Sequence, residues 1–232
     1  MLYLLPNVLS ETQNPRQVLS KQVEEVIATL DGVFCESEKK ARWYLKHFTL
    51  KMPLQQFPLV LLNEHTTSLS EHLQPLVRGE TWAILSDAGV SCVADPGSEL
   101  VKLAHEQNIA VQTIFGPCSI IQSLQLSGMG GQRFCFHGYL PREKPLRQEA
   151  LRKLEKASSE RKETQICIEA PYRNVELLTD CLQVLKPETK LCVAWELDSP
   201  NAGLIVQNVS VWKQKPLPDI HKKPAIFLFL HN

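Results

Sequence analysis

The sequence predicts an α/β protein of two domains, an open and mostly parallel sheet followed by a mixed sheet. Short apolar runs alternate with amphipathic runs through the first half of the chain, as is typical of parallel strands joined by helices. The second half has fewer helical patterns and more hairpin-compatible runs, which favours strands of mixed direction. The composition changes at the glycine-rich residues 128–131, and the two domains are expected to meet near residues 116–131. We therefore expect domains at residues 1–117 and 118–232.

In the first half, apolar runs indicate strands, and apolar residues near 3.6-residue spacing indicate helices. The expected strands are 2–5, 32–35, 59–62, 82–85 and 111–115. The expected helices are 16–30, 38–47, 69–77, 99–107 and 119–127. Gly128 is a suitable C-cap for the last of these helices, and the glycine-rich residues 128–131 are expected to form a flexible spacer.

The second half begins after this spacer. The expected strands are 134–138, 164–169, 190–197, 205–211 and 225–230. The expected helices are 146–160, which is rich in charges of both signs, and 175–185. Residues 213–223 contain Pro216 and Pro218 and are expected to be a linker.

Composition indicates a globular chain, with 44% hydrophobic and 22% charged residues. Lysine plus arginine equals aspartate plus glutamate at 25 each, so any contact with nucleic acid needs a local basic patch. The seven scattered cysteines lack a C-x-x-C pair, which argues against disulfides and structural zinc and favours a cytoplasmic protein. The apolar start at 1–6 is expected to be a strand rather than a signal peptide, and no run has membrane-spanning length.

Two loops rich in small residues follow the expected strands 82–85 and 111–115. The first runs from Ser86 to Gly97, and the second is Gly116-Pro-Cys-Ser119. Ligands of α/β sheets bind at the carboxyl ends of strands, where backbone N–H groups converge. The same residue types are also ordinary turn formers. Neither G-x-G-x-x-G nor a P-loop is present, so a ligand must be held in another way.

The order Ser-Asp-Ala-Gly-x5-Asp-Pro-Gly, then Gly-Pro-x-Ser, resembles the tetrapyrrole methylase superfamily of S-adenosylmethionine-dependent methyltransferases. Within it, the sequence resembles the ribosomal RNA small subunit methyltransferase I branch. Three further segments share this resemblance: 2–6 with its first strand, 134–141 with Phe-x-Phe-x-Gly-Phe-Leu-Pro, and 168–173 with Tyr-Glu-Ser-Pro-His-Arg.

The resemblance implies two α/β domains of the tetrapyrrole methylase type with a cofactor cleft between them. It implies S-adenosyl-L-methionine as cofactor, no metal, and a homodimer. The expected cofactor-binding residues are Leu9, Asp87, Ala88, Gly89, Val90, Ser119, Ile120, Ile168, Glu169, Ala194, Trp195 and Ala225.

Some of these residues also have a purely structural interpretation. Asp87 at a strand end can accept hydrogen bonds from the cofactor, or it can form an Asx-turn or helix cap. Ser119 can N-cap the following helix and also contact the cofactor. We expect Asp95 and Gly97 to cap the helix at 99–107 rather than to bind a ligand.

Acceptor-side residues are expected at other strand ends. Glu36 and Glu64 are the candidate catalytic pair, since a carboxylate can take the proton of a hydroxyl acceptor. His65 is expected to be an exposed loop histidine. Two basic clusters are expected to be solvated faces, with phosphate binding as the alternative: Lys39, Lys40 and Arg42, then Arg133, Arg142, Lys144, Arg147, Arg152 and Lys153.

The chain departs from the branch pattern on the acceptor side. Glu36-Ser-Glu-Lys39 stands where the branch carries Glu-Asp-Thr-Arg. Cofactor binding is therefore better supported than 2′-O-methylation of ribosomal or other structured RNA. Two alternatives stay open: a methyltransferase acting on a tetrapyrrole ring carbon, and a non-catalytic module that binds S-adenosylmethionine.

Overall fold

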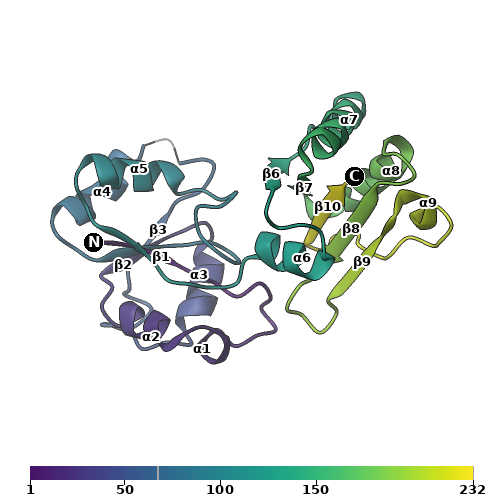
Figure 1. The fold of residues 1–232 in the computed structure, drawn as a ribbon. Coiled ribbons are helices and arrows are strands. Elements are labelled where there is room, and N and C mark those ends of the chain that lie inside the picture. The colour runs from purple at the N-terminus through teal and green to yellow at the C-terminus, as the bar shows by residue number, and fades with distance from the viewer. Residues whose placement is uncertain (67, 232) are drawn as a thin grey trace. The chain divides into compact units, whose positions relative to one another are not determined.

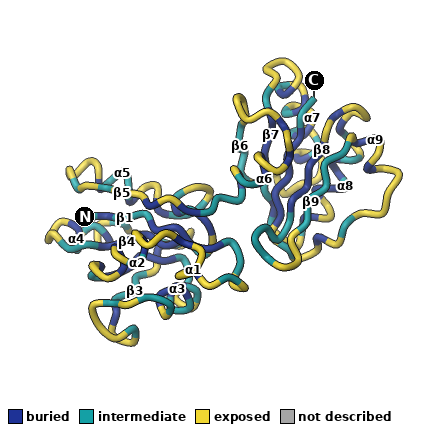
Figure 2. Tube along the Cα trace, turned by 60° about the horizontal axis from the view of Figure 1, so that its bottom comes forward, coloured by how far each residue is buried: buried dark blue, intermediate teal, exposed yellow. Residues whose placement is uncertain are grey.

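A computed structural model describes residues 1–66 and 68–231. The chain divides into two compact units, Met1–Cys118 and Ser119–Asn232 (Figure 1). Each unit is built around a five-stranded sheet, parallel in the first and mixed in the second. The predicted two-sheet α/β fold is confirmed. In both units the inner strands of the sheet are largely buried, and the most exposed residues lie mainly in loops (Figure 2).

The sheet of the first unit has the strand order β3-β2-β4-β1-β5, and every pairing is parallel. Its strands are β1 (Leu2–Leu5), β2 (Gly32–Cys35), β3 (Leu59–Leu61), β4 (Trp82–Leu85) and β5 (Val111–Thr113). Its helices are α1 (Pro15–Val18), α2 (Lys21–Ile27), α3 (Glu38–Leu45), α4 (Ser70–Val77) and α5 (Ser98–Glu106). Because all strands are parallel, their carboxyl ends meet at one edge.

Two hydrophobic clusters cover the two faces of this sheet. Along β1, Leu5 packs with the residues of α2 and α3, whereas Leu2 packs with those of α4 and α5. Figure 1 shows the same division, with α2 and α3 on one side of the strands and α4 and α5 on the other. This arrangement follows from strands that are apolar on both faces.

The expected helix at 16–30 is wrong as a single element. The backbone of Leu19 and Ser20 is extended, which separates α1 from α2. Extended backbone at this point allows the Leu19 side chain to join the core. Strand β5 ends at Thr113, two residues before the expected end, because the exposed Phe115 precedes the Gly116-Pro117 turn.

The sheet of the second unit has the order β6-β7-β10-β8-β9. Strands β6 and β7 are parallel, and the other pairings are antiparallel. The strands are β6 (Phe134–Tyr139), β7 (Thr164–Ile168), β8 (Lys190–Trp195), β9 (Gly203–Asn208) and β10 (Ala225–Leu230). The helices are α6 (Ser119–Ser127), α7 (Lys144–Arg161), the 3-10 turn η1 (Pro171–Arg173), α8 (Asn174–Val184) and α9 (Val209–Trp212).

Two expectations for this unit are corrected. The strand expected at 205–211 ends at Asn208, and helix α9 follows because the turn places the Trp212 indole in the core, where it donates to the Leu191 carbonyl at 2.9 Å. Residues 128–131 are not a free spacer. Gly128 ends α6 with φ +63°, as expected, but Met129 is buried and its N–H donates to Ser127.

Of the helices formed by residues 1–66 and 68–231, none combines the length and apolarity that crossing a bilayer requires.

Candidate functional site

The loops after β1 and β4 are joined at the carboxyl edge of the first sheet. The Asn7 N–H donates to the Gly89 carbonyl at 2.7 Å, and the Gly89 N–H donates to the Val8 carbonyl at 3.4 Å. The Asn7 side-chain amide donates to the carbonyls of Ser86 and Asp87 at 3.0 and 3.2 Å. These bonds fix the backbone of residues 86–89 and so define where their side chains point.

Gly89 is the point at which three loops converge. Its φ is +72°, a conformation that favours glycine. A Cβ atom there would lie 3.2 Å from Leu9 and 3.5 Å from the Pro117 carbonyl. The structure therefore brings together the predicted cofactor residues of the first unit, which come from the loops after β1 and β4: Leu9, Asp87, Ala88, Gly89 and Val90.

Glu36 and Asp87 are linked across neighbouring strands. The Asp87 N–H donates to Glu36 Oε1 at 3.0 Å, and the Asp87 carboxylate pairs with Lys40 at 3.4 Å. Burial raises the pKa of Glu36 above its usual value, although the bond from Asp87 acts against this shift. Helix α5 begins only at Ser98, so Asp87 is not a cap of that helix. Its carboxylate remains partly exposed.

The expected capping role of Asp95 is wrong. Gly97 stands at the N-cap of α5, as expected, and the cap has no side-chain hydrogen bond. The Asp95 carboxyl instead lies near Ser86 and Glu36. Burial, followed by the negative charge of Glu36, raises its pKa to about 7, while the nearby Ser86 hydroxyl acts in the opposite direction. Asp95 therefore exchanges its proton near neutral pH.

Glu64 and His65 lie after the edge strand β3, next to β2 in the sheet. The Glu64 side chain is 83% exposed and pairs with His65 at 3.6 Å. His65 is exposed, as expected. Glu36 is half-buried, so the two carboxylates of the predicted pair differ in environment. Burial raises the pKa of Glu36, whereas the Glu64 side chain faces solvent.

Sequence reasoning missed three polar residues that hold this edge together. Besides Asn7, the Tyr44 hydroxyl donates to the Pro6 carbonyl at 2.9 Å and the Ser91 hydroxyl donates to the Leu5 carbonyl at 2.8 Å. The position of Asn7 directly beyond an apolar strand was a usable signal. Tyr44 sits inside an amphipathic helix and gave none.

The second unit brings its predicted residues to one edge of the mixed sheet. Ile226 pairs with both Ile168 and Ala194, and Ala225 pairs with Trp195. The carboxyl ends of β7 and β8 therefore lie beside the start of β10. The Trp195 ring packs over Gly203, where a Cβ atom would lie 2.0 Å from the indole. The row is apolar and includes the predicted residues Ile168, Ala194, Trp195 and Ala225.

Two buried acceptor atoms stand out near this edge. The Glu169 carboxylate accepts from the Ala170 N–H at 2.7 Å and pairs with Arg173, yet its Oε2 has no hydrogen-bond partner among the described residues. Gln122 donates to Asp198 at 2.7 Å, and its Oε1 is likewise buried and unpartnered within the described chain. Buried polar atoms rarely stay unpaired, so each fits a ligand that brings hydrogen-bond donors.

Ser119 is the first residue of α6 rather than its N-cap, and the buried Ile120 follows it. The N-cap position of α6 therefore lies one residue earlier in the chain than expected. Backbone N–H groups in the first turn of a helix lack partners within the helix, so Ser119 lies where a ligand can be received. Among the described residues, no group of three or more His, Cys, Asp or Glu side chains is arranged to hold a metal ion.

Comparison with known proteins gives a consistent set of relatives, although no family model matches. The chain is 27% identical to ribosomal RNA small subunit methyltransferase I of Haemophilus influenzae, covering 91% of this chain and 72% of the relative. The Vibrio cholerae protein of that name is 28% identical, covering 100% and 77%. The Synechocystis protein is 36% identical, covering 77% and 62%.

Solved structures with the same fold are methyltransferases. The methyltransferase CobJ aligns with a TM-score of 0.60 at 11% identity, covering 98% of this chain and 92% of that one. Uroporphyrin-III-C-methyltransferase from Thermus thermophilus aligns with a TM-score of 0.56 at 16% identity, covering 99% and 93%.

The chain is therefore similar in sequence to proteins named ribosomal RNA small subunit methyltransferase I, and it has the fold of CobJ and of uroporphyrin-III-C-methyltransferase. The predictions of an enzyme and of S-adenosylmethionine as its cofactor agree with these relatives, which are named methyltransferases, and with a solved uroporphyrin-III C-methyltransferase of the same fold that is complexed with S-adenosylhomocysteine. The alignment with the Vibrio cholerae relative extends over both units, so the likeness to the proteins of that name is not confined to the glycine-rich loops.

Proposed function

We propose that this chain transfers a methyl group from S-adenosylmethionine to a ribose 2′-hydroxyl of ribosomal RNA. The observation that carries this proposal is the sequence identity of 27 to 36% with proteins named ribosomal RNA small subunit methyltransferase I. The joined loops around Gly89 support it, because they retain the pattern that the resemblance assigns to the cofactor.

When bound, S-adenosylmethionine supplies an activated methyl group and its own leaving group, so the protein mainly positions the reactants and excludes water. We propose that the Asp87 carboxylate accepts hydrogen bonds from donor groups of the cofactor. Leu9, Ala88 and Val90 would give apolar contact beside the bare backbone of Gly89.

The second unit would contribute contacts of another kind. Its row of apolar residues across β7, β10 and β8 suits a flat, weakly polar ring such as adenine. The unpartnered oxygens of Glu169 and Gln122 are acceptors, and amino or hydroxyl groups of the cofactor would complete them. Ser119 would add a hydroxyl at the start of α6, next to Ile120.

Glu36 is the candidate that would act on the acceptor. Its Oε1 accepts the Asp87 N–H, which leaves Oε2 to accept the proton of an incoming hydroxyl. A carboxylate whose pKa is raised by burial is a stronger base than an exposed one. Glu64 is exposed and suits positioning of the acceptor better than proton transfer.

A second candidate function is methylation of a tetrapyrrole ring carbon. The fold shared with CobJ and uroporphyrin-III-C-methyltransferase and the zero net charge of the chain favour it. The departure at Glu36-Ser-Glu-Lys39 is the main support for a module that binds the cofactor without catalysis. Transfer of a labelled methyl group to total RNA, total protein or porphyrinogens separates the three.

The decisive experiment for the leading proposal is to map modified nucleotides in ribosomal RNA from cells with and without the gene. Loss of a single 2′-O-methyl group is expected. An unchanged RNA, together with labelling of porphyrinogens, would replace it with the second candidate. We further propose that the enzyme is a cytoplasmic homodimer involved in rRNA processing, a location that the seven free cysteines suit.

A further inference from the structure

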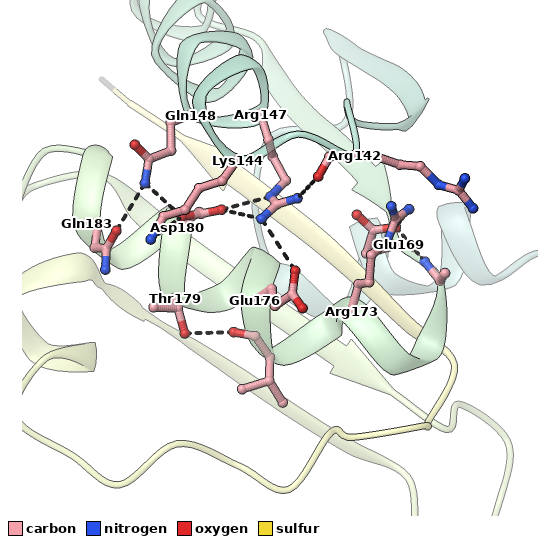
Figure 3. A network of polar contacts seen from close by, with 12 residues as sticks. Arg142, Lys144, Arg147, Gln148, Glu169, Arg173, Glu176, Thr179, Asp180 and Gln183 are labelled. Carbon is pink, nitrogen blue, oxygen red and sulfur yellow. Dashed lines mark hydrogen bonds and ion pairs between the residues drawn. The ribbon is translucent and has the colours of Figure 1, made fainter.

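A hollow of about 280 Å³ lies in the second unit, where the first turns of α7 and α8 face each other (Figure 3). Three cationic and two acidic side chains are among the residues that line it. The lining residues are Arg142, Lys144, Arg147, Val175, Glu176, Thr179 and Asp180.

The floor of the hollow is a buried ion pair. The side chains of Arg147 and Asp180 are only 3% and 2% exposed, and Arg147 Nε and Nη2 both lie 2.7 Å from Asp180 Oδ2. Gln148 donates to the other carboxylate oxygen at 2.7 Å. Removing two charges from water is costly, so such a pair is weak evidence of a stabilising role. We therefore look for the role of this ion pair in the backbone segment that it holds in place.

The ion pair positions the segment that precedes α7. Arg147 Nη1 donates to the Arg142 carbonyl at 2.7 Å, which fixes the backbone from which Arg142 and Lys144 project. Both of these side chains are exposed. Figure 3 shows the Arg142 side chain extending away from the Arg147–Asp180 pair and Lys144 lying beside Asp180.

The charge of the hollow is concentrated in these two rim cations. Asp180 neutralises Arg147, and Lys144 is 3.9 Å from the same carboxylate. The Arg142 guanidinium pairs with no carboxylate in the part of the chain that the structure describes. Of the two carboxylates that line the hollow, Glu176 is the exposed one, with 63% of its side chain accessible, and it lies 3.6 Å from Arg147. The amino ends of α7 and α8 add partial positive charge.

The rest of α7 provides a contrast. Lys153 pairs with Glu149 at 2.7 Å and Lys156 pairs with Glu160 at 3.7 Å, one helical turn apart in each case. These cations are neutralised by their own helix. Lys153 and Lys156 therefore differ from Arg142, for which the described residues provide no carboxylate within pairing distance.

We propose that this hollow, with Arg142 and Lys144 as its rim, binds the phosphodiester backbone of the RNA acceptor. The proposal rests on the proposed function. A chain of zero net charge needs a local patch to hold RNA, and arginine and lysine are the side chains that contact phosphate oxygens. Its contribution is to affinity for RNA and not to the methyl-transfer step.

The test is methyl transfer to a transcript of small-subunit ribosomal RNA by the full chain at several salt concentrations. Arg142→Ala combined with Lys144→Ala is expected to raise the KM for RNA about tenfold or more and to leave kcat unchanged. Loss of two phosphate contacts should reduce the slope of log affinity against log salt by about 1.4 to 1.8. The matched control is Lys156→Ala, which removes a paired cation from the same helix and should leave KM unchanged.

Glu176→Gln gives a test of opposite sign. Removal of the negative charge facing the rim is expected to lower the KM for RNA, a gain that a merely structural role would not produce. If the double variant keeps the KM of Lys156→Ala while the wild type methylates RNA, the hollow is not a phosphate site and the proposed function stands. If the wild type binds S-adenosylmethionine but methylates no RNA, the proposed function fails and this inference fails with it.

Discussion

The backbone N–H of Asp87 donates a 3.0 Å hydrogen bond to Oε1 of Glu36. The bond ties the loop proposed to hold the cofactor to the carboxylate proposed to act on the acceptor. Substitution of Glu36 can therefore alter cofactor binding through the loop as well as alter proton transfer. The two effects can be separated by comparing a replacement that keeps the acceptor oxygen with one that removes it.

Glu36→Gln keeps an acceptor oxygen for the Asp87 N–H but cannot take a proton. We expect its affinity for S-adenosylmethionine to stay close to that of the wild type and kcat to fall by about 10² to 10⁴, the usual contribution of general base catalysis. Glu36→Ala should lose cofactor affinity as well. Calorimetry and single-turnover rates measure the two effects. A fully active Glu36→Gln enzyme would show that another group takes the proton.

Asp87→Ala removes a charged acceptor whose hydrogen bond to the cofactor is worth roughly 1.5 to 3 kcal/mol. Cofactor affinity should fall by about one to two orders of magnitude, since each 1.4 kcal/mol is tenfold. The melting temperature should change little, because the Lys40 pair is partly exposed and such pairs contribute about 0 to 1 kcal/mol.

The matched control for Asp87 is Asp31→Ala. Asp31 precedes β2, pairs with Lys51 at 2.8 Å and accepts the Thr81 N–H, so it lies at the amino end of the sheet. Its loss should reduce stability and leave cofactor affinity unchanged. The opposite pattern at Asp87, a loss of stability with retained affinity, would remove Asp87 from the cofactor site.

Ser119→Arg places a long cation at the first residue of α6. We expect cofactor binding to be abolished, because the side chain would occupy the space beside the helix start, and the fold to be retained. Gln125→Arg, at an exposed position on the same helix, is the control and should bind normally. Calorimetry with S-adenosylhomocysteine measures both, and unchanged affinity in Ser119→Arg would exclude Ser119 from the site.

Arg147→Met leaves Asp180 buried without its cation. Breaking a buried pair in this way typically costs about 3 to 5 kcal/mol, whereas replacing both partners by apolar residues is often neutral. We therefore expect Arg147→Met to lose stability in urea unfolding and Arg147→Met/Asp180→Leu to recover most of it. If the double variant is as unstable as the single one, the pair contributes more than mutual charge compensation.

Local sequence signals predicted most of the sheet strands but not the breaks between elements. Strands Leu2–Leu5, Trp82–Leu85 and Ala225–Leu230 are apolar runs whose ends coincide with the observed ones. The break between α1 and α2 has no glycine or proline within it. The predicted strand 205–211 includes residues 209–211 because of their β-branched valines, and burial of Trp212 overrides that preference.

The same limit applies to the candidate site. Loops at strand ends were predictable from their small residues, because parallel strands bring them to one edge. The raised pKa of Asp95 was not predictable from the sequence. It depends on Glu36 and Ser86, which lie near Asp95 in space but belong to no periodic sequence pattern with it. Asn7 likewise acts on carbonyls about eighty residues away in the chain.

Asp95 gives the fold a dependence on pH that can be measured without substrate. Its pKa is about 7 in the folded chain and about 4 in an unfolded one. Between these values the folded state holds a proton that the unfolded state has released. By linkage, the free energy of unfolding falls as pH rises from about 4 to about 7, and it stays lower above that window. The groups that face Asp95 are Glu36 and Asp87, both acidic, and the Ser86 hydroxyl.

Asp95→Asn removes this titration while keeping the shape of the side chain. The variant should therefore gain stability relative to the wild type when the pH is raised from 5 to 8, and urea unfolding at the two pH values measures the difference. Asp219→Asn is the control, because the hydrogen bond from Lys223 lowers the pKa of this exposed carboxyl, so it titrates below the window. Equal stability differences at pH 5 and pH 8 for Asp95→Asn would mean that Asp95 is ionised throughout this range. The acidic group at the ends of β2 and β4 would then carry its full negative charge at neutral pH, which would make it a stronger binder of cationic groups.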